Sequence, residues 1–193
     1  MNSSSTTREL TLRDQLRAAT HSRHELLDGA WESVSFAEEP HYARFLSAQL
    51  AARLPIERWC ETNAPAGLRP PETTGLLIED LSRLAMPYSL RGAVLEMPAG
   101  ADPANAALGL AWAVAGSHLG NRAILARLRK QGADMPASFL EHAAMIAFWR
   151  SILPLLDKPA GSAAAQEATD AANAVFDCFA HAMGVPCEGR LAA

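Results

Sequence analysis

The chain has 193 residues, of which 49% are hydrophobic, and a formal net charge of −4. This length suits one domain with a full core, and the acidic balance argues against the basic surface that nucleic acid binding requires. The three cysteines, Cys60, Cys178 and Cys187, lack the spacing of a zinc site or a disulfide framework. No apolar run approaches the roughly 20 residues of a membrane span, and the first ten residues do not resemble a secretory signal. We therefore expect a cytoplasmic protein that binds neither nucleic acid nor a membrane.

Apolar residues recur at helical spacing along almost the whole chain, and the breaks fall at glycine and proline. In chain order, this predicts helices over about 8–28, 40–61, 72–84, 102–132, 136–157 and 162–183. Pro55 is expected to kink or divide the second helix, Asp102 to cap the fourth and Gly184 to end the last. The pattern indicates an all-α helical bundle formed by residues 8–185, with a flexible N-terminus over 1–7 and a C-terminal tail over 186–193.

The first predicted helix carries a histidine on the stripe that should face the interior, which consists of Leu16, Thr20, His24 and Leu27. His21 points away from this stripe. A buried histidine is by default a hydrogen-bonded core residue, but Asp28, four residues after His24, is placed to accept the second imidazole N–H. Arg17 lies two turns earlier on the same side. The helix face therefore combines a candidate metal ligand, its hydrogen-bond partner and a positive charge for an anion.

The fourth predicted helix has a face with almost no side chains, made by Gly109, Ala113, Gly116 and Gly120. Each mid-helix glycine costs roughly 1 kcal/mol relative to alanine, so something is expected to approach this backbone closely. A tightly packed neighbouring helix is one explanation. The other is a flat ligand held against a bent helix.

Several segments resemble bacterial biliverdin-producing heme oxygenases, most closely those that accompany bacterial phytochromes. "LRAATHSRHELLD" is similar to that family's first helix, in which Thr-x-x-x-His carries the proximal heme ligand, so the resemblance implies Thr20 and His24 in these places, with Asp28 hydrogen-bonded to the ligand. "AWAVAGSHLGNRAILARL" resembles the distal helix, with Gly116 and Gly120 against the heme. "HYARFL" and "AFWRSILPLLD" are also similar to family segments. The resemblance places Arg150 where a basic residue can meet a heme propionate, and we expect Arg17, which lies on the same side as His24, to pair with a propionate as well.

The resemblance implies an all-α heme oxygenase fold and the oxidative cleavage of heme to biliverdin, carbon monoxide and ferrous iron. Heme would be both substrate and cofactor, consumed with O₂. No flavin or nicotinamide fold is indicated, so electrons are expected from a ferredoxin or another reductase, and a bacterial phytochrome is the expected recipient of biliverdin. Many relatives have an aspartate where this chain has Ser117, so the water that delivers protons is expected to be held by Ser117 and Asn121.

Three other interpretations remain open at this stage. The first is a non-catalytic heme-binding or heme-sensing protein of the same fold, with His118 as a second axial ligand, although at 100° per residue His118 lies about 200° from Gly116. The second is a helical enzyme of thiaminase-like architecture, for which Cys178 is the only candidate nucleophile. The third is a structural interaction module, which would leave His24 and Asp28 unexplained.

Overall fold

The computed structural model describes residues 10–186, and this part of the chain is helical. The elements in order are α1 (Leu12–Gly29), α2 (Glu39–Asn63), the short 3-10 helix η1 (Ala66–Leu68), α3 (Thr74–Arg83), α4 (Pro103–Lys130), α5 (Ala143–Leu156) and α6 (Ser162–Met183). The extended pairing found among the described residues is an isolated bridge between Thr11 and Pro159. The predicted all-α class is confirmed. The predicted terminal segments 1–7 and 186–193 lie outside the described residues except for Pro186.

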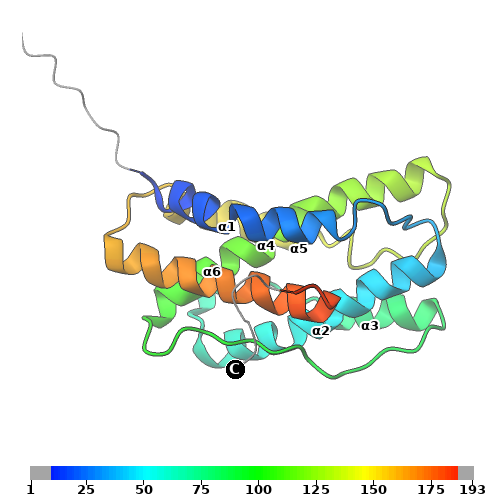
Figure 1. The fold of residues 1–193 in the computed structure, drawn as a ribbon, viewed down its shortest axis with the longest axis horizontal. Coiled ribbons are helices and arrows are strands. Elements are labelled where there is room, and N and C mark those ends of the chain that lie inside the picture. Colours follow the sequence, from blue (N-terminus) through cyan, green and yellow to red (C-terminus); the bar gives the residue numbers. More distant parts are fainter. Residues whose placement is uncertain (1–9, 187–193) are drawn as a thin grey trace, which may run out of the picture.

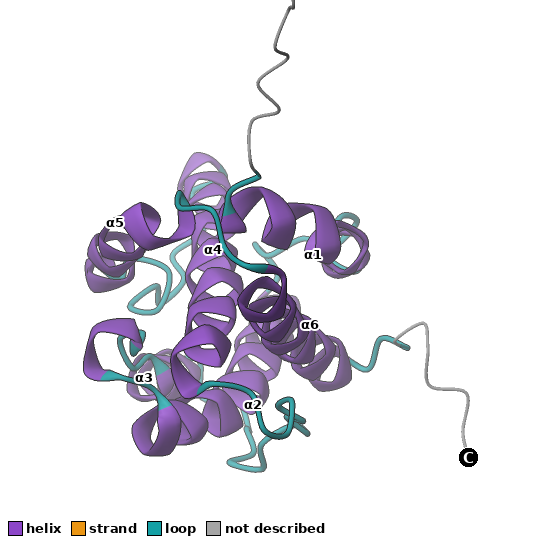
Figure 2. Cartoon of the chain, turned by 90° about the vertical axis from the view of Figure 1, so that its left-hand side faces the viewer, coloured by secondary structure: helices purple, strands orange, loops and turns teal. Residues whose placement is uncertain are grey.

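The longest helix, α4, forms the centre of the bundle. It packs against α6 and α5, while α6 also packs against α1 and α2, and α2 packs against α3. Figure 1 shows the helices running roughly along the long axis, and Figure 2, which looks along that axis, shows α4 surrounded by the others. None of the helices described is long and apolar enough to cross a membrane.

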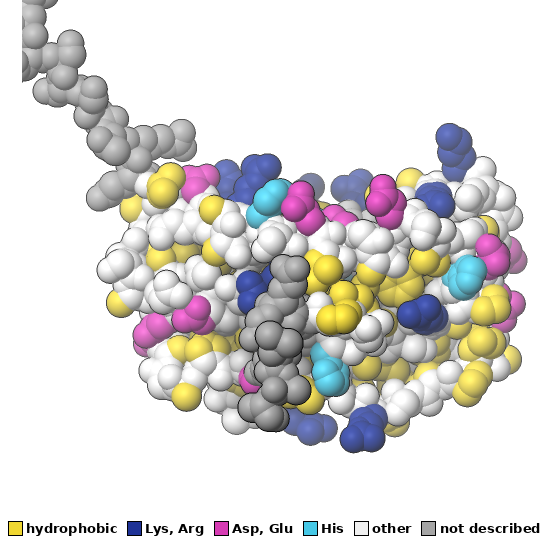
Figure 3. Space-filling view, in the orientation of Figure 1, with side chains coloured by type: hydrophobic (Ala, Val, Ile, Leu, Met, Phe, Trp, Pro, Cys, Tyr) yellow, Lys and Arg dark blue, Asp and Glu magenta, His cyan; other side chains and the backbone are white. Residues whose placement is uncertain are grey.

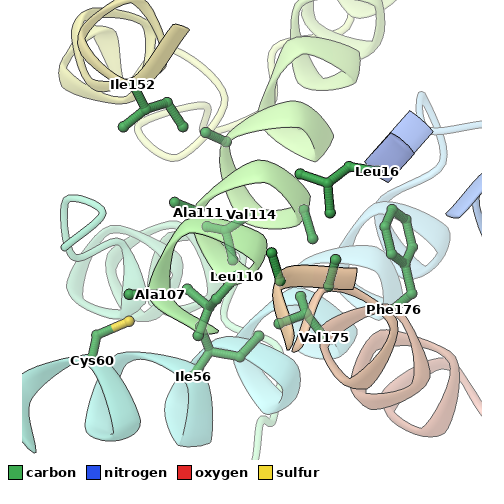
Figure 4. Close-up of a cluster of buried hydrophobic side chains, with 14 of the residues drawn as sticks. Leu16, Ile56, Cys60, Ala107, Leu110, Ala111, Val114, Ile152, Val175 and Phe176 are labelled. Carbon is green, nitrogen blue, oxygen red and sulfur yellow. The ribbon is translucent and has the colours of Figure 1, made fainter. Parts of the chain in front are cut away.

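Two clusters of buried side chains hold the bundle together. The larger one joins α1, α2, α4, α5 and α6, and Figure 4 shows Leu16, Leu110 and Val114 converging with Val175 and Ile56 within it. The smaller cluster joins the start of α2 to α3, to the end of α4 and to the loop before α5. Burial of these apolar side chains is the main force that stabilises the fold.

The helix ends are set by local hydrogen bonds. Thr11 and Asp14 form a capping box at the start of α1, so this helix begins after the predicted start at about residue 8. Asp102 caps α4 by accepting hydrogen bonds from the backbone of Ala104 and Asn105, as predicted. Gly184 ends α6 in the left-handed conformation with φ of 69°, which also confirms the sequence analysis.

The sequence predicts that Pro55 kinks or divides the second helix, and the structure shows that the helix is not divided there. Pro55 has no N–H to donate to the Ala51 carbonyl, but the backbone N–H of Ala93 donates to that carbonyl instead, at 2.7 Å. The segment around Gly92 passes close to Pro55, since a Cβ added at Gly92 would lie 3.0 Å from the proline Cδ. The missing hydrogen bond is therefore supplied from outside the helix, and α2 continues to Asn63.

The fifth helix is shorter than predicted, because residues 136–142 form a loop. The carboxylate of buried Asp80 accepts hydrogen bonds from the backbone of Ser138 and Phe139, at 3.0 and 2.9 Å. The hydroxyl of Tyr42 donates to the Pro136 carbonyl at 2.8 Å. These side-chain partners replace helical hydrogen bonds and hold the loop against α2, α3 and α4.

Candidate functional site

A cavity of about 740 Å³ opens between α1, α4 and α6, within the size range of small-molecule and cofactor sites. Its lining is largely apolar and includes Phe36 and Phe45 from one core cluster and Phe176 and Phe179 from the other. The cavity therefore lies between the two core clusters. In Figure 3, hydrophobic side chains gather on the surface between the C-terminal halves of α1 and α6.

His24 lines this cavity from α1. Leu16 and Thr20, earlier on the same stripe, are buried, whereas the His24 side chain is 52% exposed because the stripe reaches the cavity at this turn. Nδ1 of His24 lies 3.0 Å from the Asp28 carboxylate, the pairing that the i, i+4 spacing predicts. With Nδ1 donating to Asp28, Nε2 is left to bind a metal.

The position of His24 is held by its neighbours. The guanidinium of Arg23 pairs with the carboxylate of Asp177 at 2.8 Å, which joins α1 to α6 beside the cavity. The ring of Phe176 lies 6.1 Å from that of His24. His21, by contrast, is 69% exposed and pairs with Glu25 at 3.3 Å, so it points away from the stripe as expected.

The glycine face of α4 divides into two parts with different roles. A Cβ added at Gly109 would lie 1.8 Å from the carbonyl oxygen of Ala168, so α6 packs directly on this glycine. A Cβ added at Gly116 or Gly120 would meet nothing within 4 Å, and both residues line the cavity. The tight-packing explanation is therefore correct for Gly109, while Gly116 and Gly120 expose helix backbone to an open space.

Ser117 and Asn121 provide the polar groups that α4 contributes to the cavity lining. The Ser117 hydroxyl donates to the Val114 carbonyl at 2.8 Å, so its oxygen remains available as an acceptor. Nδ2 of Asn121 lies 3.0 Å from Nδ1 of His118. The α4 wall therefore offers hydrogen-bonding groups and no carboxylate.

Three predicted site residues are not in the cavity lining. Arg17 is exposed and lies two helical turns before His24, where the cavity does not extend. Arg150 is exposed on α5, which contributes no residue to the lining. Thr20 is buried and donates to the Leu16 carbonyl at 2.8 Å. Both arginines are therefore absent from the lining, because the cavity follows the C-terminal half of α1, and their contact with heme propionates stays a prediction.

The positions of His118 and Cys178 also do not support the alternative roles considered for them, a second axial ligand and a nucleophile. His118 is 1% exposed and is not part of the cavity lining, in agreement with its angular position on α4. Cys178 is buried, and burial raises the pKa of its thiol to about 12. A thiol held in this protonated form is a poor nucleophile.

The sequence analysis missed residues that complete the cavity. Phe176 and Phe179 were given no role by the sequence analysis, but both line the cavity from α6. Their spacing of three places them on one helical face, a signal that was present in the sequence. Trp31 and Phe36 reach the cavity from the loop between α1 and α2, and no local pattern indicates where a loop will fold.

These features define a class of protein: an all-α bundle with a cofactor-sized apolar cavity between a histidine-bearing helix and a glycine-bearing helix. No family model matches the chain, and no curated protein matches its sequence. Among solved structures, the chain is similar to the NO- and CO-bound heme oxygenase of Neisseria meningitidis, with a TM-score of 0.67 and 21% identity over 93% of this chain and 96% of that one.

The chain therefore has the fold of a bacterial heme oxygenase. The likeness extends over nearly the whole of both chains, so it includes the helices that form the cavity. At this level of identity the likeness establishes the fold, while activity has to be argued from the site.

Proposed function

We propose that this protein is a heme oxygenase that cleaves heme to biliverdin, carbon monoxide and ferrous iron, using O₂ and electrons from an external donor. The observation that carries the proposal is the pairing of His24 and Asp28 in a cavity that is also lined by helix backbone without side chains, at Gly116 and Gly120. The phytochrome-associated type is proposed from the sequence resemblance alone.

The cavity has properties that suit heme. Its volume of about 740 Å³ and its aromatic lining match a large, flat, apolar molecule. Nε2 of His24 is the group that would bind iron, and the Asp28 carboxylate would fix the tautomer and strengthen the imidazole as a ligand. An imidazole ligand suits this reaction, because a thiolate ligand favours cleavage of the O–O bond.

The α4 wall would control how oxygen and protons reach the substrate. The missing side chains at Gly116 and Gly120 leave room for the porphyrin and for a small ligand next to the backbone. Ser117 and Asn121 would hold ordered water at this wall, and such water passes protons without a nearby carboxylate. This arrangement would replace the aspartate that many relatives carry.

The proposal includes two partners. Heme cleavage consumes electrons that His24 and the polar groups of α4 cannot supply, so we propose a ferredoxin or another reductase as the donor. A bacterial phytochrome is the proposed recipient of biliverdin, on the basis of the sequence resemblance.

The test is a turnover assay with purified protein, hemin, O₂, a ferredoxin and its reductase, with catalase added to remove free peroxide. The expected result is a Soret band after hemin is added, followed by its loss and the appearance of the biliverdin spectrum. Heme that stays intact for many minutes with reductant would contradict the enzyme proposal. Failure to form any Soret complex would contradict heme binding itself.

A second candidate function is heme binding without turnover. The observation in its favour is that no α4 carboxylate lines the cavity, so the proton relay depends on neutral groups and water. The same assay separates the two functions, because a binding protein would keep its Soret band in the presence of the electron donor.

A further inference from the structure

Three nitrogen-bearing side chains are clustered behind the α4 wall of the cavity. Arg53 from α2 is 1% exposed, and its guanidinium carbon lies 5.1 Å from the centre of the Phe139 ring. The rings of His118 and His142 are 6.4 Å apart and nearly perpendicular. Nε and Nη2 of Arg53 and the Nε2 atoms of both His118 and His142 are buried without a hydrogen-bond partner. Polar groups buried in this way are costly, and apolar packing alone does not require them.

Asn121 connects this cluster to the cavity. It lies one helical turn after His118 on α4, and it lines the cavity while His118 does not. The 3.0 Å contact between Nδ2 of Asn121 and Nδ1 of His118 joins the two side chains. Either the amide N–H₂ donates to an unprotonated Nδ1, or a reversed amide places its oxygen against a protonated Nδ1. The two arrangements turn opposite ends of the amide toward the cavity.

The surroundings of His118 favour the first arrangement. Burial, and then the positive charge of Arg53, lower the pKa of His118 to about 4, so the ring is neutral at pH 7 and carries one proton. Nε2 of His118 is buried without a hydrogen-bond partner, while a backbone group of His142 near the ring favours its protonated form. A proton on Nε2 leaves the Nδ1 lone pair for Asn121.

We propose that His118 is a positioning residue, which holds the Asn121 amide with its oxygen toward the cavity through the contact at Nδ1. The cavity wall then presents a hydrogen-bond acceptor at residue 121. The orientation of the amide is independent of any ligand, whereas its effect on bound heme rests on the proposed function. An acceptor at this wall favours an iron ligand that donates a hydrogen bond, such as water, over fluoride, which only accepts.

The orientation is tested on the apo protein by nitrogen-15 NMR at pH 7. We expect His118 to be the neutral tautomer with the proton on Nε2, and a coupling across the hydrogen bond between Nδ1 and the Asn121 amide nitrogen. The His118→Phe spectrum assigns the signals. His142→Phe is the matched control and should keep both features. A proton on Nδ1 of His118 in the wild-type protein would overturn the proposal, and this measurement needs no variant to fold.

The consequence for the ligand is tested with fluoride binding to the hemin-loaded ferric protein. His118→Phe frees the amide to turn its N–H₂ group toward the cavity, so fluoride affinity should rise several-fold, while His142→Phe should leave it unchanged. An unchanged or lower fluoride affinity in His118→Phe would contradict the positioning role. If wild-type protein forms no complex with hemin, the proposed function fails, and the NMR result still decides the orientation of Asn121.

Discussion

At the scale of single residues, His24 and His21 show how position on one helix separates two chemically identical side chains. Both have an acidic partner four residues later, at 3.0 Å for His24 and 3.3 Å for His21. His24 lines the cavity beside Phe176, whereas His21 faces solvent. Location therefore distinguishes His24 as the candidate ligand, since the local hydrogen bond is the same.

This pair gives the first prediction. His24→Ala should fold and lose the spectrum of imidazole-bound heme, because alanine is a good helix former and the iron-binding nitrogen is removed. His21→Ala is the matched control and should bind hemin like the wild type. The measurement is the ferric and ferrous absorption spectrum of each variant with hemin. Equal spectra for the two variants would show that His24 is not the ligand.

A second residue-scale prediction concerns His118 and the dependence of stability on pH. Its pKa is lowered by burial and by Arg53 to about 4 in the folded state, and is about 6.5 when unfolded. Between these values the unfolded chain binds the extra proton, so the free energy of unfolding falls as the pH falls from 6.5 toward 4. This histidine contributes a slope of up to about 1.4 kcal/mol per pH unit in that interval.

Urea unfolding at several pH values between 5 and 7 measures this slope. The free energy of unfolding of His118→Phe should depend less on pH than that of the wild type. The difference between the two slopes should correspond to about one proton. Parallel pH profiles for the two proteins would contradict a depressed pKa at His118.

At the scale of elements, α4 uses glycine for two different purposes. Near its start, Gly109 lets α6 approach to direct backbone contact at Ala168. About two and three turns after Gly109, Gly116 and Gly120 leave the cavity open. The same helix thus packs against α6 near its start and lines the cavity in its middle.

The third prediction compares alanine at these positions. Gly109→Ala should destabilise the protein by about 1–3 kcal/mol or more, because the new Cβ would clash with a backbone oxygen that cannot rotate away. Gly116→Ala should stabilise the apo protein by up to about 1 kcal/mol through helix propensity, and should weaken hemin binding because the methyl group enters the cavity. Thermal unfolding and hemin titration measure the two effects. A loss of stability in Gly116→Ala would contradict the open space at this position.

At the scale of the whole molecule, the cavity lies between the two core clusters, and residues of α2 and α4 belong to both clusters. A ligand that fills it would contact α1, α4 and α6 together, in addition to the Arg23–Asp177 pair that already joins α1 to α6. Binding to the folded state alone raises its stability by mass action.

The fourth prediction follows from this linkage. Hemin at about 100 times its Kd should stabilise the protein by about 2.7 kcal/mol, which raises the midpoint of thermal unfolding by roughly 5–10 °C for a chain of this size. The shift should be much smaller for His24→Ala at the same hemin concentration and unchanged for His21→Ala. Calorimetry with and without hemin measures it, and equal shifts in both variants would contradict a specific site at His24.

The sequence by itself determined most of the helices and the His24–Asp28 pair, because these depend on local interactions. The caps at Asp102 and Gly184 and the i, i+4 pairing of His24 with Asp28 involve residues within one or two helical turns. Helical periodicity also placed His24 on the inner stripe of α1, and it placed His118 away from Gly116 on α4.

Only the tertiary structure decided which segments contact one another. The Ala93 N–H that completes α2 at Pro55 comes from a distant segment, and so does the Asp80 carboxylate that holds the loop before α5. The exposed placement of Arg17 away from the cavity and the approach of α6 to Gly109 also depend on how the helices pack. Contacts between segments far apart in the chain leave no periodic signal in either segment, so their outcome is fixed by packing of the whole core.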